Sequence, residues 1–118
     1  RDLGRELGCL GHVTALRRTR VGPFHEADAV PLQALLDAPE RAFDALLSVE
    51  AGLAELDCVV VDRNAAARLR RGQSIILRGR DAPAEGVEAY AACGGVPVAF
   101  GTVQGGELVP SRVFNLEV

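Results

Sequence analysis

The stretch that decides the fold is GHVTALRRTRVGPF, residues 11–24. It is rich in residues that favour β-strands, holds three arginines within four positions, and stops at a Gly-Pro turn. Alternation along a strand predicts one face made of His12, Thr14, Leu16, Arg18 and Arg20. Neither face is wholly apolar, so we expect a surface strand. It suits contact with a phosphate backbone and an unstacked base, but an edge strand with solvated arginines fits the pattern equally.

The composition is that of an ordinary soluble protein. The chain has 118 residues, of which 48% are hydrophobic and 25% charged, enough for one modest domain or two very small ones. No apolar run is long enough to span a bilayer and no signal peptide opens the sequence, so we expect a cytoplasmic protein. Its cysteines, Cys9, Cys58 and Cys93, lack metal-ligand spacing and predict reduced, partly buried thiols; a zinc site or catalytic cysteine is the weaker alternative.

The charges fall into separate blocks. The net charge is −3, but residues 1–21 carry +3 and residues 63–80 carry +6 without a single acid. Between and after these cationic islands lie residues 22–62 at −8 and residues 81–118 at −4. Two such islands predict a localised footprint for a polyanion.

The remaining patterns predict an α+β chain. A helix tail over residues 1–8 ends at Gly8, and acidic helices with an apolar side follow Pro31 and Pro39. After a linker that begins at residues 51–52, we expect a short buried strand over residues 58–61. A basic helix over residues 65–71 follows, capped by Asp62 or Asn64. Short strands over residues 74–77, 87–93, 96–103, 108–109 and 112–116, with two Gly-Gly turns, predict a small closed or half-open barrel.

The N-terminal quarter resembles the bacterial tRNA pseudouridine synthase B family. In that family a short helix with an Asp-Leu-Gly pattern leads through Gly-Cys-x-x-His to a Leu-Arg-Arg-Thr-x-x-Gly-x-Phe strand. This chain carries RDLGRELGC at residues 1–9, GHV at 11–13 and LRRTRVGPF at 16–24; it departs from the family at Leu10 and Gly11. The likeness extends more loosely to the C-terminus, where RGQ at residues 71–73 before a strand resembles the family's PUA-like domain.

The resemblance implies a function and a division of the chain. The family isomerises a uridine in the T-loop of tRNA to pseudouridine, with no metal or organic cofactor. Its nucleophilic aspartate stands in a Gly-Arg-Leu-Asp context that this sequence lacks, so we expect the C-terminal part of a larger enzyme, inactive alone and without catalytic residues of its own. Residues 1–56 would be the end of the catalytic domain, with a helix, a strand and supporting helices. Residues 57–118 would be a small PUA-like β-barrel that binds RNA.

Three residues of the first island are expected at the substrate. By the resemblance, Leu16 forms one wall of the uridine pocket, although ordinary core packing is its alternative. Arg17 and Arg18 face opposite ways on a strand, so one would meet T-arm phosphate and the other a structural ion pair; the sequence leaves open which. Arg20 is expected to bind RNA as well.

The second island predicts a further RNA contact. Arg68, Arg70 and Arg71 lie near the end of the basic helix, where cations also complement the helix dipole. Capping alone does not account for the six arginines of this island, which are Arg63, Arg68, Arg70, Arg71, Arg78 and Arg80. The resemblance directs Arg68, Arg70 and Arg71 toward the acceptor stem.

Two other functions stay open from the sequence. The chain could be a free-standing PUA-like RNA-binding module without catalysis, or a protein-interaction module whose arginines pair with its own acidic helices. A Gly-Arg-Leu-Asp stretch encoded upstream of Arg1 would favour the synthase, and an initiator methionine close by would favour the module. The expected partner is tRNA, bound by a monomer.

Overall fold

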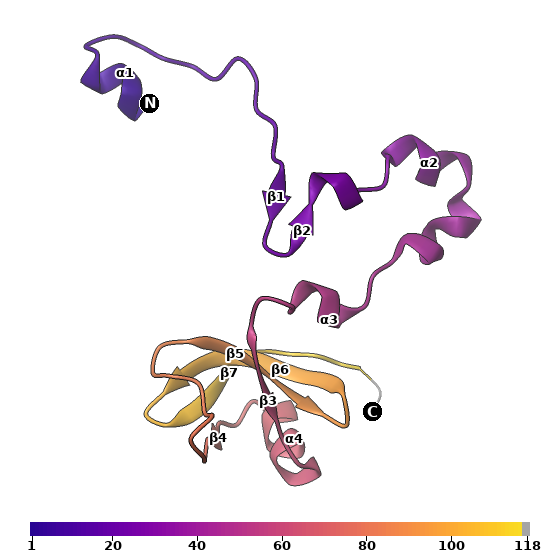
Figure 1. Ribbon diagram of the computed structural model, residues 1–118, viewed down its shortest axis with the longest axis vertical. Coiled ribbons are helices and arrows are strands. Elements are labelled where there is room, and N and C mark those ends of the chain that lie inside the picture. The colour runs from indigo at the N-terminus through magenta and orange to yellow at the C-terminus, as the bar shows by residue number, and fades with distance from the viewer. Residues whose placement is uncertain (117–118) are drawn as a thin grey trace.

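The computed structural model describes residues 1–116, and these form two unlike halves (Figure 1). The C-terminal half is a curled sheet with one helix against it. The N-terminal half is a path of short elements that leads away from this sheet. The radius of gyration is 19.9 Å, whereas a compact domain of this size has about 13 Å. The extended N-terminal half therefore determines the overall dimensions.

One five-stranded sheet organises the C-terminal half. Its strands are β3 (Asp57–Val60), β4 (Ile75–Ile76), β5 (Glu88–Cys93), β6 (Val96–Gln104) and β7 (Glu107–Val113). They are ordered β3-β5-β6-β7-β4, with β3 parallel to β5 and every other pair antiparallel. In the described residues the edge strands β3 and β4 do not pair with each other, so the sheet curls but stays open. This confirms the α+β class.

The two predicted Gly-Gly turns are confirmed. Gly94 and Gly95 join β5 to β6 with φ of 60° and 81°, and Gly105 and Gly106 join β6 to β7 with φ of 60° and 72°. Two successive positive φ values are what a tight hairpin between right-twisted strands requires. Glycine adopts them without steric cost.

Two strand predictions need correction. The strands expected over residues 108–109 and 112–116 are one strand, β7, which shifts register opposite Phe100 and Gly101. The strand expected to be buried over residues 58–61 lies at the sheet edge, and most of its residues are exposed. An apolar run alone does not distinguish a central strand from an edge strand.

The core lies between the sheet and α4 (Arg63–Arg70). Leu69 of the helix is fully buried and Ala66 is 2% exposed. They pack with Val98 of β6 and Leu108 of β7, which are also fully buried. The helix begins at the N-cap Asp62 and is followed by Gly72 at φ 75°, as the sequence predicted for its end.

The N-terminal half contains seven short elements. They are α1 (Asp2–Glu6), β1 (Arg20–Val21), β2 (Phe24–His25), η1 (Glu26–Asp28), α2 (Leu32–Asp37), η2 (Pro39–Ala45) and α3 (Val49–Gly52). The predicted helix before Gly8 is α1, and Gly8 follows it at φ 69°. The helix expected after Pro31 is α2, but the one after Pro39 is a 3₁₀ helix that ends at Ala45.

The strand predicted over residues 12–21 is mostly wrong. Within that range only Arg20 and Val21 form strand, and they pair with Phe24 and His25 across the Gly-Pro turn. Residues 11–19 run without regular structure because no described neighbouring strand offers its backbone groups to them. Gly22 at φ 54° closes the two-residue hairpin, and the Glu26 amide donates to the Thr19 carbonyl at 2.9 Å.

The N-terminal half has almost no core of its own. Among residues 1–56 only Gly4 and Leu53 are buried, and large apolar side chains such as Phe43 (82% exposed) and Leu46 (73%) face outward. The apolar side predicted for these elements is therefore largely exposed. No helix among residues 1–116 is both long and apolar enough to cross a bilayer.

We expect Gly101→Ala to destabilise the sheet by about 3 kcal/mol, because an added Cβ has no room. It would overlap the Val109 carbonyl oxygen and lie 2.7 Å from the Val109 carbonyl carbon and 2.8 Å from Pro110 Cα. Urea unfolding measures the loss. Gly52→Ala is the matched control, since its Cβ meets only the Phe24 ring at 3.7 Å; equal stabilities of the two variants would contradict the prediction.

Candidate nucleic-acid interface

Two arginines of the first cationic island contact carboxylates of the chain itself. Arg17 pairs with Glu26, which follows β2, and Arg20 pairs with Glu55 in the segment before β3. Arg20 Nε also donates to the Gly22 carbonyl at 2.7 Å, inside the hairpin turn. All four charged side chains are at least about one-third exposed, so these pairs add little stability. Their effect is to orient the guanidinium groups.

Arg18 differs from its neighbours. It is exposed and forms no ion pair with any residue of the described chain 1–116. The sequence left open which of Arg17 and Arg18 forms an ion pair, and in the structure it is Arg17. The phosphate contact at Arg18 stays a prediction.

Leu16 lies in the open beside these arginines. It is 84% exposed, so its alternative role as a core residue finds no support within residues 1–116. Its place as a pocket wall stays a prediction.

The second island sits on α4 and the segment after it. The Asp62 side chain accepts a hydrogen bond from the Ala65 amide at 2.7 Å, which selects Asp62 over Asn64 as the N-cap. With Ala66 and Leu69 buried, the helix must present its arginines outward. Arg68, Arg70 and Arg71 are exposed and form no ion pair with described residues. Arg63 lies on the same helix. The sequence analysis counted it in the acid-free island but did not name it with Arg68, Arg70 and Arg71 as a residue that contacts the acceptor stem.

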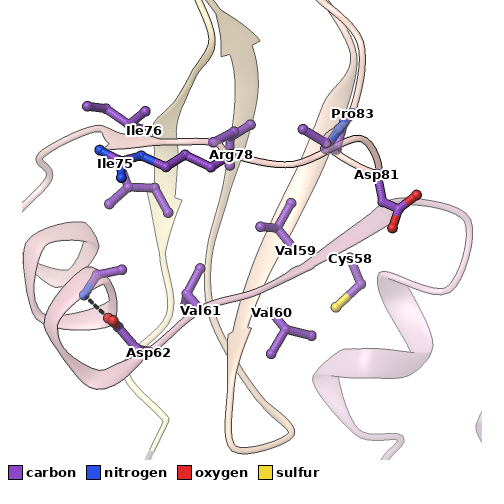
Figure 2. A pocket seen from close by; sticks show the side chains of 13 residues that line it. Cys58, Val59, Val60, Val61, Asp62, Ile75, Ile76, Arg78, Asp81 and Pro83 are labelled. Carbon is purple, nitrogen blue, oxygen red and sulfur yellow. Dashed lines mark hydrogen bonds between the residues drawn. The ribbon is translucent and has the colours of Figure 1, made fainter.

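An open cavity of about 510 Å³ separates the two edges of the sheet. Figure 2 shows Val59 and Val61 of the β3 side facing Ile75 of β4, while the Arg78 side chain extends toward Ile75 and Ile76 from the segment after β4. Asp81 and Cys58 line the far end. In a closed barrel the edge strands β3 and β4 would pair where this cavity lies. Among the described residues, a single arginine, Arg78, lines it.

Tyr90 adds no charge beside this cavity. It faces Cys58 across the parallel β3–β5 pair. Hydrogen bonding to Cys58, followed by partial burial, raises the pKa of the Tyr90 hydroxyl above its ordinary value of 10.0. The phenol therefore stays neutral near pH 7.

The thiols do not form a metal site in the described residues. Cys9 and Cys58 are exposed and only Cys93 is buried, which corrects the expectation of three partly buried thiols. No group of three or more potential metal ligands occurs among residues 1–116. The chemistry that this surface offers is the binding of anions by guanidinium groups.

Comparison with known proteins gives consistent matches. Residues 1–62 match the family described as tRNA pseudouridylate synthase B C-terminal domain. A tRNA pseudouridine synthase B from Rhodopseudomonas palustris is 50% identical over an alignment of 123 residues. The alignment takes in 98% of this chain and 34% of the relative. Proteins of the same name from Nitrobacter winogradskyi and Bradyrhizobium diazoefficiens are each 48% identical, covering 98% of this chain and 34% and 36% of the relatives. The chain spans about a third of the length of these curated relatives.

Replacing the helix cap tests how the second island is held. We expect Asp62→Ala to destabilise the domain by about 1 kcal/mol, because the Ala65 amide loses its acceptor. Asn64→Ala, two residues further along the chain, serves as the control. Its free energy of unfolding in urea should stay within about 0.5 kcal/mol of the parent. Equal losses would mean that Asp62 is not the cap.

Proposed function

Since the chain belongs to the tRNA pseudouridine synthase B family, we propose that it is the C-terminal part of a synthase that isomerises a T-loop uridine of tRNA to pseudouridine. In this proposal the chain binds tRNA and forms one wall of the uridine pocket. The nucleophilic aspartate belongs to the remaining part of the enzyme, so this part alone is inactive. The protein acts in the cytoplasm as a monomer.

The observation that carries the proposal is the set of exposed arginines without acidic neighbours. Residues 63–80 hold six arginines and no carboxylate, and Arg68, Arg70 and Arg71 are all exposed. Like charges crowded in this way repel one another, so the arrangement destabilises the free protein slightly. Phosphates of an RNA backbone remove that repulsion and release counterions. We assign these three arginines to the acceptor stem.

The N-terminal arginines serve the T-arm in this proposal. Arg18 contacts a phosphate, and Arg17 holds the segment in place through Glu26. Arg20 uses Nε and Nη2 within the protein, so its Nη1 group provides the remaining donors for RNA. The two salt bridges thus position a short cationic ridge formed by residues 17–20.

Leu16 adjoins this ridge and covers the base. An enzyme that acts on a base within a folded RNA must take it out of its stack. The exposed Leu16 side chain gives the displaced uracil an apolar wall that excludes water. The reaction breaks the bond between N1 of the uracil and C1′ of the ribose and forms a bond between C5 of the uracil and the same C1′. C5 loses a proton and N1 gains one, so the product is an isomer, and by the resemblance neither metal nor organic cofactor takes part.

We propose a boundary between residues 1–56 and 57–118, of which the structure describes the second unit to residue 116. The core residues all belong to the second unit except Leu53. Its curled sheet, with α4 across it, supports a PUA-like barrel that is open between β3 and β4. The exposed apolar side chains of the first unit, including Phe43 and Leu46, then pack on the rest of the catalytic domain.

A free-standing RNA-binding module is the second candidate. The self-contained core of residues 57–116 favours it, because such a unit can fold without the segment before it. The two candidates share the arginine surface and differ in catalysis. The coding sequence before Arg1 separates them, since only a synthase needs the Gly-Arg-Leu-Asp stretch.

Substitution of Arg18 tests the T-arm contact. In filter binding of a tRNA transcript, Arg18→Gln should lower the slope of log affinity against log salt by about one. Arg41→Gln removes the same charge from η2, outside the proposed surface, and should leave the slope unchanged. Equal slopes for the two variants would remove Arg18 from the interface.

Substitution of the helix arginines tests the acceptor-stem contact. The triple variant Arg68→Gln, Arg70→Gln and Arg71→Gln should weaken tRNA binding and reduce the salt slope by about three, because each charge neutralises about one phosphate. Circular dichroism and urea unfolding should match the parent, since all three side chains are exposed. Unchanged affinity at matched salt would refute this contact.

A further inference from the structure

The arginines of α4 occupy two different flanks of the helix. With about 3.6 residues per turn, Arg63 and Arg70 are nearly two full turns apart and therefore lie on one flank. Arg68 lies on the opposite flank, with the buried Ala66 and Leu69 turned toward the sheet between them. The helix arginines therefore cannot all contact the same phosphate.

The flank that carries Arg63 and Arg70 adjoins a separate cavity. Its volume is about 330 Å³, and it is lined by Arg63, Ala66, Arg70 and Cys93. Ala66 and Cys93 are 2% and 7% exposed, so they form its floor, and the two exposed arginines stand at its rim. Among residues 1–116, the charged groups that line it are these two guanidinium groups.

Helix capping does not explain Arg63. It is the first residue of α4, where the helix dipole disfavours a cation and favours an anion. The nearest carboxylate in sequence, Asp62, accepts from the Ala65 amide, and Arg63 forms no ion pair within residues 1–116. An anion bound on this flank would neutralise the two arginines that line the cavity.

We propose that Arg63 and Arg70 clamp one phosphodiester of the RNA backbone above Ala66 and Cys93. This rests on the proposed function, namely that the chain binds tRNA, and it adds Arg63 to the interface. Seven residues correspond to about 10 Å along the helix axis, a separation that two long side chains close by reaching toward each other. A guanidinium offers two parallel N–H donors to phosphate oxygens, so the pair fixes both the position and the orientation of the strand.

A double-mutant cycle tests the clamp. In filter binding of a tRNA transcript, Arg63→Gln and Arg70→Gln should each weaken binding about tenfold. The double variant should be little weaker than either single variant, because one remaining arginine does not hold the phosphate. The pair Arg68→Gln with Arg70→Gln should instead show multiplied effects, since those residues lie on opposite flanks. Arg112→Gln, an exposed charge on β7, is the control for general charge loss and should bind as the parent does.

Alkylation of Cys93 gives a readout that is independent of affinity. In a Cys9→Ser, Cys58→Ser background Cys93 is the only thiol, and saturating tRNA should slow its reaction with iodoacetamide several-fold. Adding Arg63→Gln and Arg70→Gln should abolish this protection even at RNA concentrations that restore saturation. Urea unfolding of each variant checks that the fold is retained.

The outcomes separate the clamp from the function on which it rests. Multiplied effects of Arg63→Gln and Arg70→Gln, or no protection of Cys93 by bound tRNA, would overturn the clamp while tRNA binding stands. If neither these variants nor the Arg68 variant changes affinity, helix α4 is not an RNA contact. That result would overturn both the clamp and the proposed role of the second cationic island.

Discussion

The burial of one face of α4 against the curled sheet is the constraint on which the rest of the surface depends. Leu69 is fully buried and Ala66 nearly so, against Val98 and Leu108. Their burial fixes the rotation of the helix about its axis, because turning it would expose Leu69 and leave a void in a close-packed core. The directions in which the helix arginines point are therefore set by the apolar contacts of Ala66 and Leu69 on the buried face of the helix.

The two halves of the chain rely on different sources of order. Residues 57–116 contain nearly all the buried side chains, whereas the N-terminal half is held by a two-residue hairpin, short helical turns and two exposed salt bridges. Such pairs contribute at most about 1 kcal/mol each, far less than the conformational entropy of ordering some fifty residues. In the proposed function, the exposed Phe43 and Leu46 form one side of a core that the rest of the catalytic domain completes.

Prediction from sequence succeeded where the determinants were local. The Gly-Gly hairpins and the helix end at Gly72 each involve residues within a few positions of one another. The sequence narrowed the N-cap to Asp62 or Asn64, and the structure selects Asp62. Prediction failed where a distant partner decides. Whether residues 11–19 form a strand depends on a neighbouring strand, and the edge position of β3 depends on its parallel pairing with β5 some thirty residues on. Similarly, only the position of Glu26 shows that Arg17, and not Arg18, forms an ion pair.

The net charge of −3 conceals how the fold distributes charge. Glu26 and Glu55 belong to the acidic block, and they neutralise Arg17 and Arg20 of the first island. No described carboxylate pairs with the arginines of the second island, so its charge remains available to solvent ions. Counterions released on binding come from unneutralised charge. In the proposed function, the second island therefore contributes most of the salt-dependent affinity for RNA. The first island, whose Arg17 and Arg20 are oriented by internal pairs, would contribute mainly to the position of the substrate.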